Sequence, residues 1–167
     1  LRDSGKRKEL EIWARKNNID IAFLQETWIN QCSVERREHY TILFSSDDNK
    51  SITKTEAGVA IMISNKHLNK VFDIEPISDR LMTITLRGTI THTFINTYMH
   101  TSKHPERNPE IYAEITKLIN KYKSGGPVFI CGDFNADIQS TDANNTHKAV
   151  GAHTFDKDNE QHITNQG

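Results

Sequence analysis

The chain has 167 residues, a length typical of one domain that can bury a hydrophobic core. Its 21 basic and 22 acidic residues give a net charge of −1, which argues against a protein that coats nucleic acid through its overall field. Phosphate binding would therefore depend on a local basic patch or on a metal ion. The two cysteines form no Cys-x-x-Cys motif, so we expect neither a structural zinc site nor a disulfide framework.

The sequence contains no recognisable signal peptide and no apolar run that approaches the length of a membrane span. We therefore expect a soluble intracellular protein, nuclear or cytoplasmic, with no membrane partner. Leu1 lies within a sequence pattern and is not an initiating methionine, so we also expect the chain to be a piece of something longer.

The N-terminal region predicts a helix followed directly by a strand. Residues 5–17 carry apolar side chains at helical spacing, and Ser4 is the expected N-cap. Residues 19–24 form an apolar run interrupted only by Asp20, which is typical of a buried strand. This order is half of a βαβ unit.

The middle of the chain predicts a loop and then several strands. Residues 29–56 are polar and mostly irregular, with a short strand expected at 40–44. Strands are predicted at 58–64, 81–86 and 90–99, and their succession suggests an antiparallel meander. The sheet should therefore be mixed or antiparallel.

A second helix and a second buried strand follow. Asn108 is the expected N-cap of the helix, Pro109 suits its first turn, and residues 124–127 end it. Residues 128–131 are all apolar, which predicts a strand that is buried on both faces. Its Cys131 is expected to be a small core residue.

Polar side chains follow this strand at alternate positions. Asp133, Asn135 and Asp137 would share one side of the backbone, just past Gly132. Ligand-binding groups lie at such strand ends in α/β proteins. The ordinary alternative is a Gly-Asp turn in which these residues serve the backbone alone.

Other strand ends carry polar groups too, namely Glu26 and Tyr98. If these strands lie side by side, Glu26, Tyr98, Asp133 and Asn135 converge at one edge of the sheet. A carboxylate suits Mg²⁺ or Mn²⁺, which need only one or two protein carboxylates. A second carboxylate can accept a proton from water, and amide and phenol groups can donate to phosphate oxygens.

Four stretches resemble one enzyme superfamily. Residues 20–27 read Asp-Ile-Ala-Phe-Leu-Gln-Glu-Thr, residues 80–84 read Arg-Leu-Met-Thr-Ile, residues 96–98 read Asn-Thr-Tyr, and residues 132–135 read Gly-Asp-Phe-Asn. Together they resemble the motifs of the endonuclease/exonuclease/phosphatase superfamily, the DNase I-like metal-dependent phosphoesterases. The similarity is greatest to the apurinic-endonuclease-like domain of non-LTR retrotransposons.

The resemblance implies an α/β (α+β) fold, a four-layer α/β/β/α sandwich with mixed sheets. It implies that Glu26 holds Mg²⁺ or Mn²⁺ and that Asp133 aligns or deprotonates the attacking water. Asn135 and Tyr98 would contact the phosphate. The implied activity is a metal-dependent DNA endonuclease that nicks target DNA, as part of a longer polyprotein with a reverse transcriptase.

The resemblance also implies three phosphate-binding candidates, Arg80, His100 and Thr101. Arg80 begins a strand that resembles the family's Arg-led strand, whereas His100 and Thr101 lie in a loop after Tyr98 that departs from the family pattern. The family's first strand and its terminal Ser-Asp-His motif have no counterpart here, which implies that residues 1–167 are a single partial domain. The alternatives are a non-catalytic remnant that serves as a binding module, a repair endonuclease, an RNA deadenylase, or an inositol-phosphate or sphingomyelin phosphatase.

Overall fold

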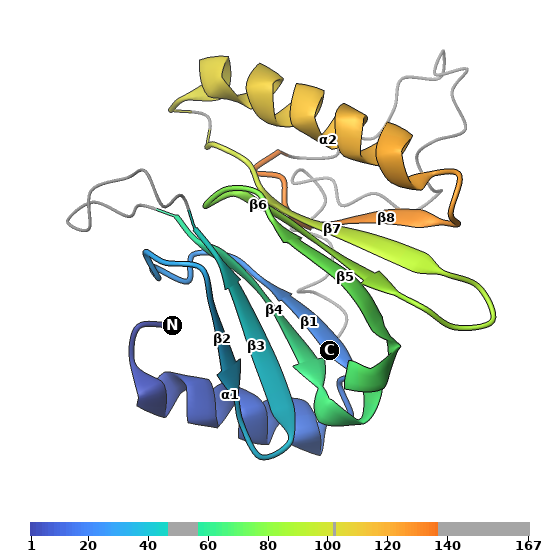
Figure 1. Ribbon diagram of the computed structural model, residues 1–167. Helices are drawn as coiled ribbons and strands as arrows, with labels where there is room; N and C mark the ends of the chain where they lie inside the picture. Colours follow the sequence, from blue (N-terminus) through green and yellow to red (C-terminus); the bar gives the residue numbers. More distant parts are fainter. Residues whose placement is uncertain (47–56, 102, 137–167) are drawn as a thin grey trace, which may run out of the picture. The chain divides into compact units, whose positions relative to one another are not determined.

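The described residues, 1–46, 57–101 and 103–136 of a computed structural model, fold into two four-stranded sheets with a long helix against each (Figure 1). Residues 1–135 form one compact unit. The predicted turn residue Asp137 and the polar segment after it lie outside the described residues.

The first sheet contains four antiparallel strands. In spatial order they are β1 (Ile21–Leu24), β4 (Val59–Ser64), β3 (Tyr40–Ser45) and β2 (Ser33–Arg36). Strands β3 and β4 are almost completely buried, as their apolar sequences predict. Strand β1 is at an edge of this sheet among the described strands, and Glu26 follows it.

The second sheet is mixed. Its order is β5 (Val71–Pro76), β6 (Leu81–Leu86), β7 (His92–Tyr98) and β8 (Val128–Asp133). Strands β5, β6 and β7 pair in antiparallel fashion, whereas β7 and β8 are parallel. The short 3₁₀ helix η1 (Asn65–Lys70) links the two sheets between β4 and β5.

Three apolar clusters define four layers. The central cluster joins β3 and β4 to β6 and includes Ile61 and Ile84, so the two sheets pack face to face. Helix α1 (Ser4–Lys16) packs through Ala14 on the outer face of the first sheet. Helix α2 (Asn108–Tyr122) packs through Ile115 and Leu118 on the outer face of the second. The predicted α/β/β/α sandwich is confirmed.

Helix α2 is the crossover between two parallel strands. A short 3₁₀ helix, η2 (Pro105–Arg107), leads into α2, and β8 follows it. A parallel crossover brings the C-terminal ends of its two strands to the same edge of the sheet. Tyr98 and Asp133 accordingly occupy paired positions at the ends of β7 and β8.

Both predicted helix caps are wrong. Asp3 caps α1, because its Oδ1 accepts a hydrogen bond from the backbone N–H of Gly5 at 2.7 Å, and Ser4 is the first helical residue. Arg107 occupies the N-cap position of α2 without a side-chain hydrogen bond. Asn108 uses its amide instead to bind the backbone of His100 in the preceding loop.

The predicted meander of 58–64, 81–86 and 90–99 is wrong in its first strand, and it omits β5. Strand β4 belongs to the first sheet, and the antiparallel meander of the second sheet consists of β5, β6 and β7. Strands β2 and β5 escape sequence analysis because every second residue is exposed and charged residues interrupt both. Short, half-exposed edge strands carry little apolar signal.

Strand β8 is not buried on both faces among the described residues. Phe129 and Ile130 are 44% and 39% exposed, and Cys131 is only partly buried. The reason is that β8 is the last of the described strands in the second sheet, where Val128 packs against the cluster under α2. The prediction that the chain is a single partial domain stays a prediction.

Neither described helix has the length and apolar character needed to cross a membrane.

Gly132 provides a test of how β7 and β8 approach each other. It has φ +134°, and a Cβ atom there would lie 1.9 Å from the carbonyl oxygen of Thr97. Replacing Gly132 with Ala should therefore lower the free energy of unfolding by about 2 kcal/mol or more, measured by urea titration. Gly88→Ala is the matched control, because its nearest atom would be 3.4 Å away and its φ is not positive. Equal effects of the two substitutions would contradict this close contact.

Candidate active site

A carboxylate and a phenol from different sheets meet at the strand ends. Tyr98, at the end of β7, donates a hydrogen bond from its hydroxyl to Oε1 of Glu26 at 2.7 Å. Glu26 follows β1 in the first sheet and is exposed to solvent. The predicted convergence therefore spans the two packed sheets and not neighbouring strands of one sheet.

The backbone around Glu26 is held in an uncommon conformation. Glu26 and Trp28 have φ values of +53° and +58°, in the left-handed region. The fully buried Thr27 between them donates its backbone N–H to the carbonyl of Gly58 at 3.0 Å. A Cβ atom on Gly58 would lie 2.3 Å from Thr27 Oγ1, so only glycine permits this close packing. The turn thus presents the Glu26 carboxylate in a defined place.

The end of β8 forms a second rigid turn. Asp133 Oδ1 accepts a hydrogen bond from the backbone N–H of Asn135 at 2.9 Å, and Asn135 has φ +47°. The side-chain amide of Asn135 donates to the carbonyl of Met99 at 2.8 Å. An amide nitrogen carries two protons, so one donor of Asn135 remains for a substrate. Both side chains are on exposed residues, as contact with a substrate requires.

Arg80 packs against the phenol ring from the start of β6. Its guanidinium carbon is 4.8 Å from the centre of the Tyr98 ring, and Nη1 donates to the carbonyl of Tyr98 at 3.3 Å. His100 is half-buried in the loop after β7, where its backbone is bound by Asn108, and Thr101 is exposed. The structure therefore places Arg80 at the site and the other two phosphate-binding candidates on the adjoining loop.

Burial and charge set the protonation of this site. Burial, and then the Glu26 carboxylate, raise the pKa of Tyr98 to about 12, so its phenol stays protonated at neutral pH. The charge of Asp133 acts in the same direction and that of Arg80 opposes it. Arg80 lies over the phenol ring, and Asp133 is the register partner of Tyr98 on β8. Burial lowers the pKa of His100, as do the positive charges of Arg80 and Arg107, so that imidazole is neutral at pH 7.

The site fits a hard cation that keeps most of its water. No group of three or more His, Cys, Asp or Glu side chains comes together within 1–46, 57–101 and 103–136. Glu26 offers a solvent-facing carboxylate that is hydrogen-bonded to Tyr98. Mg²⁺ is bound in this way, through one or two carboxylates together with substrate phosphates, whereas zinc takes three or four protein ligands.

Two residues behind the site, Asn96 and Gln25, are not evident as functional from the sequence. Asn96 is fully buried in β7 and makes three side-chain hydrogen bonds, one of them with Gln25. An asparagine within an otherwise β-forming run is a signal, because a buried amide needs partners. The sequence does not show where those partners are, since they belong to the other sheet.

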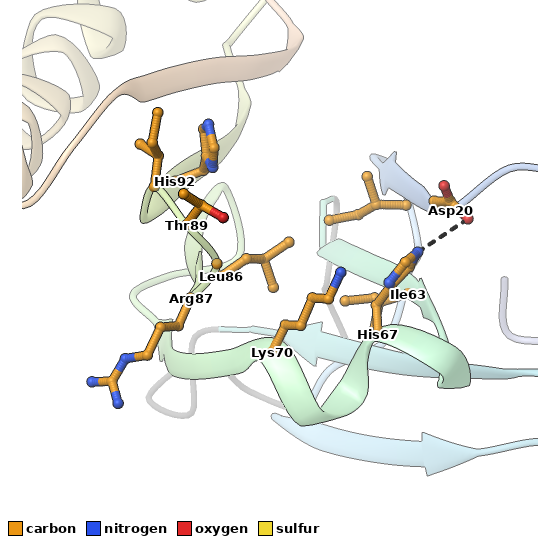
Figure 2. A pocket seen from close by; sticks show the side chains of 11 residues that line it. Asp20, Ile63, His67, Lys70, Leu86, Arg87, Thr89 and His92 are labelled. Carbon is orange, nitrogen blue, oxygen red and sulfur yellow. Dashed lines mark ion pairs between the residues drawn. The ribbon is translucent and has the colours of Figure 1, made fainter.

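A cavity of about 450 Å³ lies at the opposite ends of the same strands. Its walls are mostly apolar, and Figure 2 shows His67 turned toward Asp20, 3.3 Å away, and Arg87 extending outward. The lining residues are Asp20, Ile21, Ile63, His67, Lys70, Leu86, Arg87, Gly88, Thr89, Ile90 and His92. None of the predicted site residues is among them, so the candidate active site is the open edge at Glu26 and Tyr98.

Comparison with known protein families matches residues 1–165 to the Endonuclease/Exonuclease/phosphatase family. The chain belongs to this family. Its members are generally hydrolases that act on phosphodiester bonds and depend on a divalent metal ion. A search of the curated proteins found no match. The retrotransposon subtype stays a prediction.

Removing the Glu26 charge should change the titration of its phenol partner. In Glu26→Gln, the pKa of Tyr98 should fall from about 12 toward its ordinary value of 10.0, because a negative charge beside the phenolate disappears. The fall should be partial, since burial is the larger cause. Phenolate absorbance, measured as the difference from Tyr98→Phe in each background, isolates Tyr98 from the other tyrosines.

The same shift gives folding stability a pH dependence of known sign. Between pH 10 and about 12, folded Tyr98 keeps a proton that the unfolded chain loses, so stability falls as the pH rises. This fall should be smaller in Tyr98→Phe. Glu9→Gln, an exposed substitution on α1, is the control for both measurements. A Tyr98 titration that is the same in Glu26→Gln and in the control would contradict the hydrogen bond.

Proposed function

We propose that the protein is a Mg²⁺-dependent phosphodiesterase that nicks DNA. The observation that carries this proposal is the hydrogen bond between Tyr98 and Glu26, at the strand edge that also presents Asp133 and Asn135. A hydrolase of phosphodiesters needs a carboxylate for a cation, a base for water and neutral donors for phosphate. These four side chains supply that set.

Each side chain has a distinct part in the proposed reaction. Asp133, which is exposed, accepts the proton of the attacking water, and Asn135 directs its remaining amide proton at a phosphate oxygen. Glu26 would hold the Mg²⁺ ion, which stabilises negative charge as it develops on the phosphate. Tyr98 has a single proton, here given to Glu26, and can donate it to phosphate only when Glu26 takes another partner.

Local positive charge supports DNA as the substrate. The net charge of −1 provides no general attraction, but Arg80 and Arg107 lie near enough to His100 to lower its pKa. The Arg107 side chain is 61% exposed; its Nε lies 3.8 Å from Oε1 of Glu106, and the rest of its guanidinium can reach a flanking phosphate. On this proposal the chain is the endonuclease of a non-LTR retrotransposon polyprotein that also carries a reverse transcriptase and acts inside the cell.

A binding module without catalysis is the competing proposal. The observation in its favour is that the described residues form no group of three or more His, Cys, Asp or Glu side chains that could hold a metal ion. Such a module would bind DNA without cutting it, so activity and binding must be measured separately.

The first test is nicking of supercoiled plasmid with Mg²⁺. Glu26→Gln and Asp133→Asn should each reduce the rate by about 100-fold or more, because each removes a charge that acts on the reacting groups. EDTA should abolish nicking. Asp20→Asn is the matched control, since this carboxylate lies at the start of β1 and pairs with Lys66.

The products separate the possible substrates. A 3′-hydroxyl at each nick, detected by extension with a DNA polymerase, supports a priming endonuclease. Faster cleavage of polyadenylate RNA or of an inositol phosphate would reject DNA as the substrate. Plasmid binding without Mg²⁺-dependent nicking would favour the binding module.

A further inference from the structure

Asn96 is a buried amide that joins the two sheets. Its residue is 0% exposed, and its Nδ2 donates to the carbonyls of Ala60 at 2.9 Å and Leu24 at 3.2 Å. Its Oδ1 accepts a hydrogen bond from Nε2 of Gln25 at 2.7 Å. Asn96 is on β7 of the second sheet, whereas all three partners belong to, or directly follow, strands of the first.

An amide is an unusual choice for this position. Phe94, two residues earlier on the same face of β7, packs in the apolar cluster between the sheets. A buried amide is costly unless its polar atoms are paired, and here both donors and the acceptor have partners. An apolar residue would fill the space without this dependence on geometry, so the amide calls for a directional role.

The partners of Asn96 lie next to the candidate active site. Tyr98 comes two residues after Asn96, and Leu24 and Gln25 directly precede Glu26. Two of the three hydrogen bonds, those with Leu24 and Gln25, therefore tie the ends of β1 and β7 together just before the Tyr98–Glu26 contact. The third holds β7 to Ala60 of β4. Movement of one strand end relative to the other would strain the Tyr98–Glu26 contact and the first two bonds together.

We propose that Asn96, acting with Gln25, is a positioning residue that holds Glu26 in register with Tyr98 and thereby sets the affinity of Glu26 for a divalent cation. The cation part of this inference rests on the proposed function. The bond to Ala60 joins the sheets themselves, and the bond to Gln25 reaches the turn that carries Glu26. The two contributions can therefore be separated by substitution.

The test uses three variants of the whole chain. Gln25→Met removes only the link to the Glu26 turn and keeps a side chain of similar length at a half-buried position. Asn96→Leu removes all three bonds. Thr93→Val is the matched control, because it deletes a buried hydrogen bond, to Thr85 at 3.1 Å, from the other end of the same strand.

Two readouts need no catalysis. The first is the pKa of the Tyr98 phenol. It should fall from about 12 toward 10.0 in Gln25→Met and Asn96→Leu but not in Thr93→Val. The second is Mn²⁺ binding, followed by electron paramagnetic resonance, which should weaken about 10-fold in the first two variants. Unfolding by urea, run in parallel, shows whether the control loses a comparable amount of stability.

The outcomes decide between a positioning role and a structural one. If Gln25→Met and Thr93→Val are equally destabilised and only Gln25→Met changes the titration and Mn²⁺ binding, the proposal holds. If Gln25→Met, folded, keeps the wild-type values of both, the proposal is overturned, even where Asn96→Leu fails to fold. Nicking by Glu26→Gln tests the proposed function alone, so a failure of that function is distinguishable from a failure of this one.

Discussion

The burial of apolar side chains between the two sheets is the interaction on which the rest of the structure depends. Apolar contact supplies most of the favourable free energy of such packing. Tyr98 belongs to this central cluster and is only 6% exposed, yet its hydroxyl reaches the solvent-facing Glu26. Core and candidate site therefore share a residue, and a change in how the sheets pack is a change in the site.

Directional bonds complete what apolar packing leaves undetermined. Apolar contact resists separation of the sheets but tolerates small sliding, because it has little orientation dependence. The amide of Asn96 and the close approach of Gly132 to Thr97 both require one relative placement of the backbones. The first restrains β7 against the other sheet, and the second restrains it against β8. Together they restrain the two sides of the candidate site.

The charge distribution suits a protein that binds phosphate locally. A nearly neutral chain gains nothing from long-range attraction, so its affinity must come from groups at the site. Arg80 contributes there in two ways, because it lies over the Tyr98 ring and its positive charge acts on His100. Membership of the Endonuclease/Exonuclease/phosphatase family agrees with this arrangement, since its members act on phosphodiester bonds.

The strongly patterned elements and the residue types of the candidate site can be predicted from local sequence alone. Helical spacing in α1 and α2 and the apolar runs of β1, β4 and β6 are local signals, and the positions of Glu26, Tyr98, Asp133 and Asn135 at strand ends follow from them. Four features depend on the tertiary structure: β4 lies in the first sheet, β8 is at the edge of the second sheet among the described strands, Asp3 caps α1, and Glu26 meets Tyr98 across the two sheets. The tertiary structure also decided the partners of Asn96. The physical reason is that periodicity reports the burial of a segment, whereas pairing depends on residues far apart in the chain, whose contact is established only when the sheets pack.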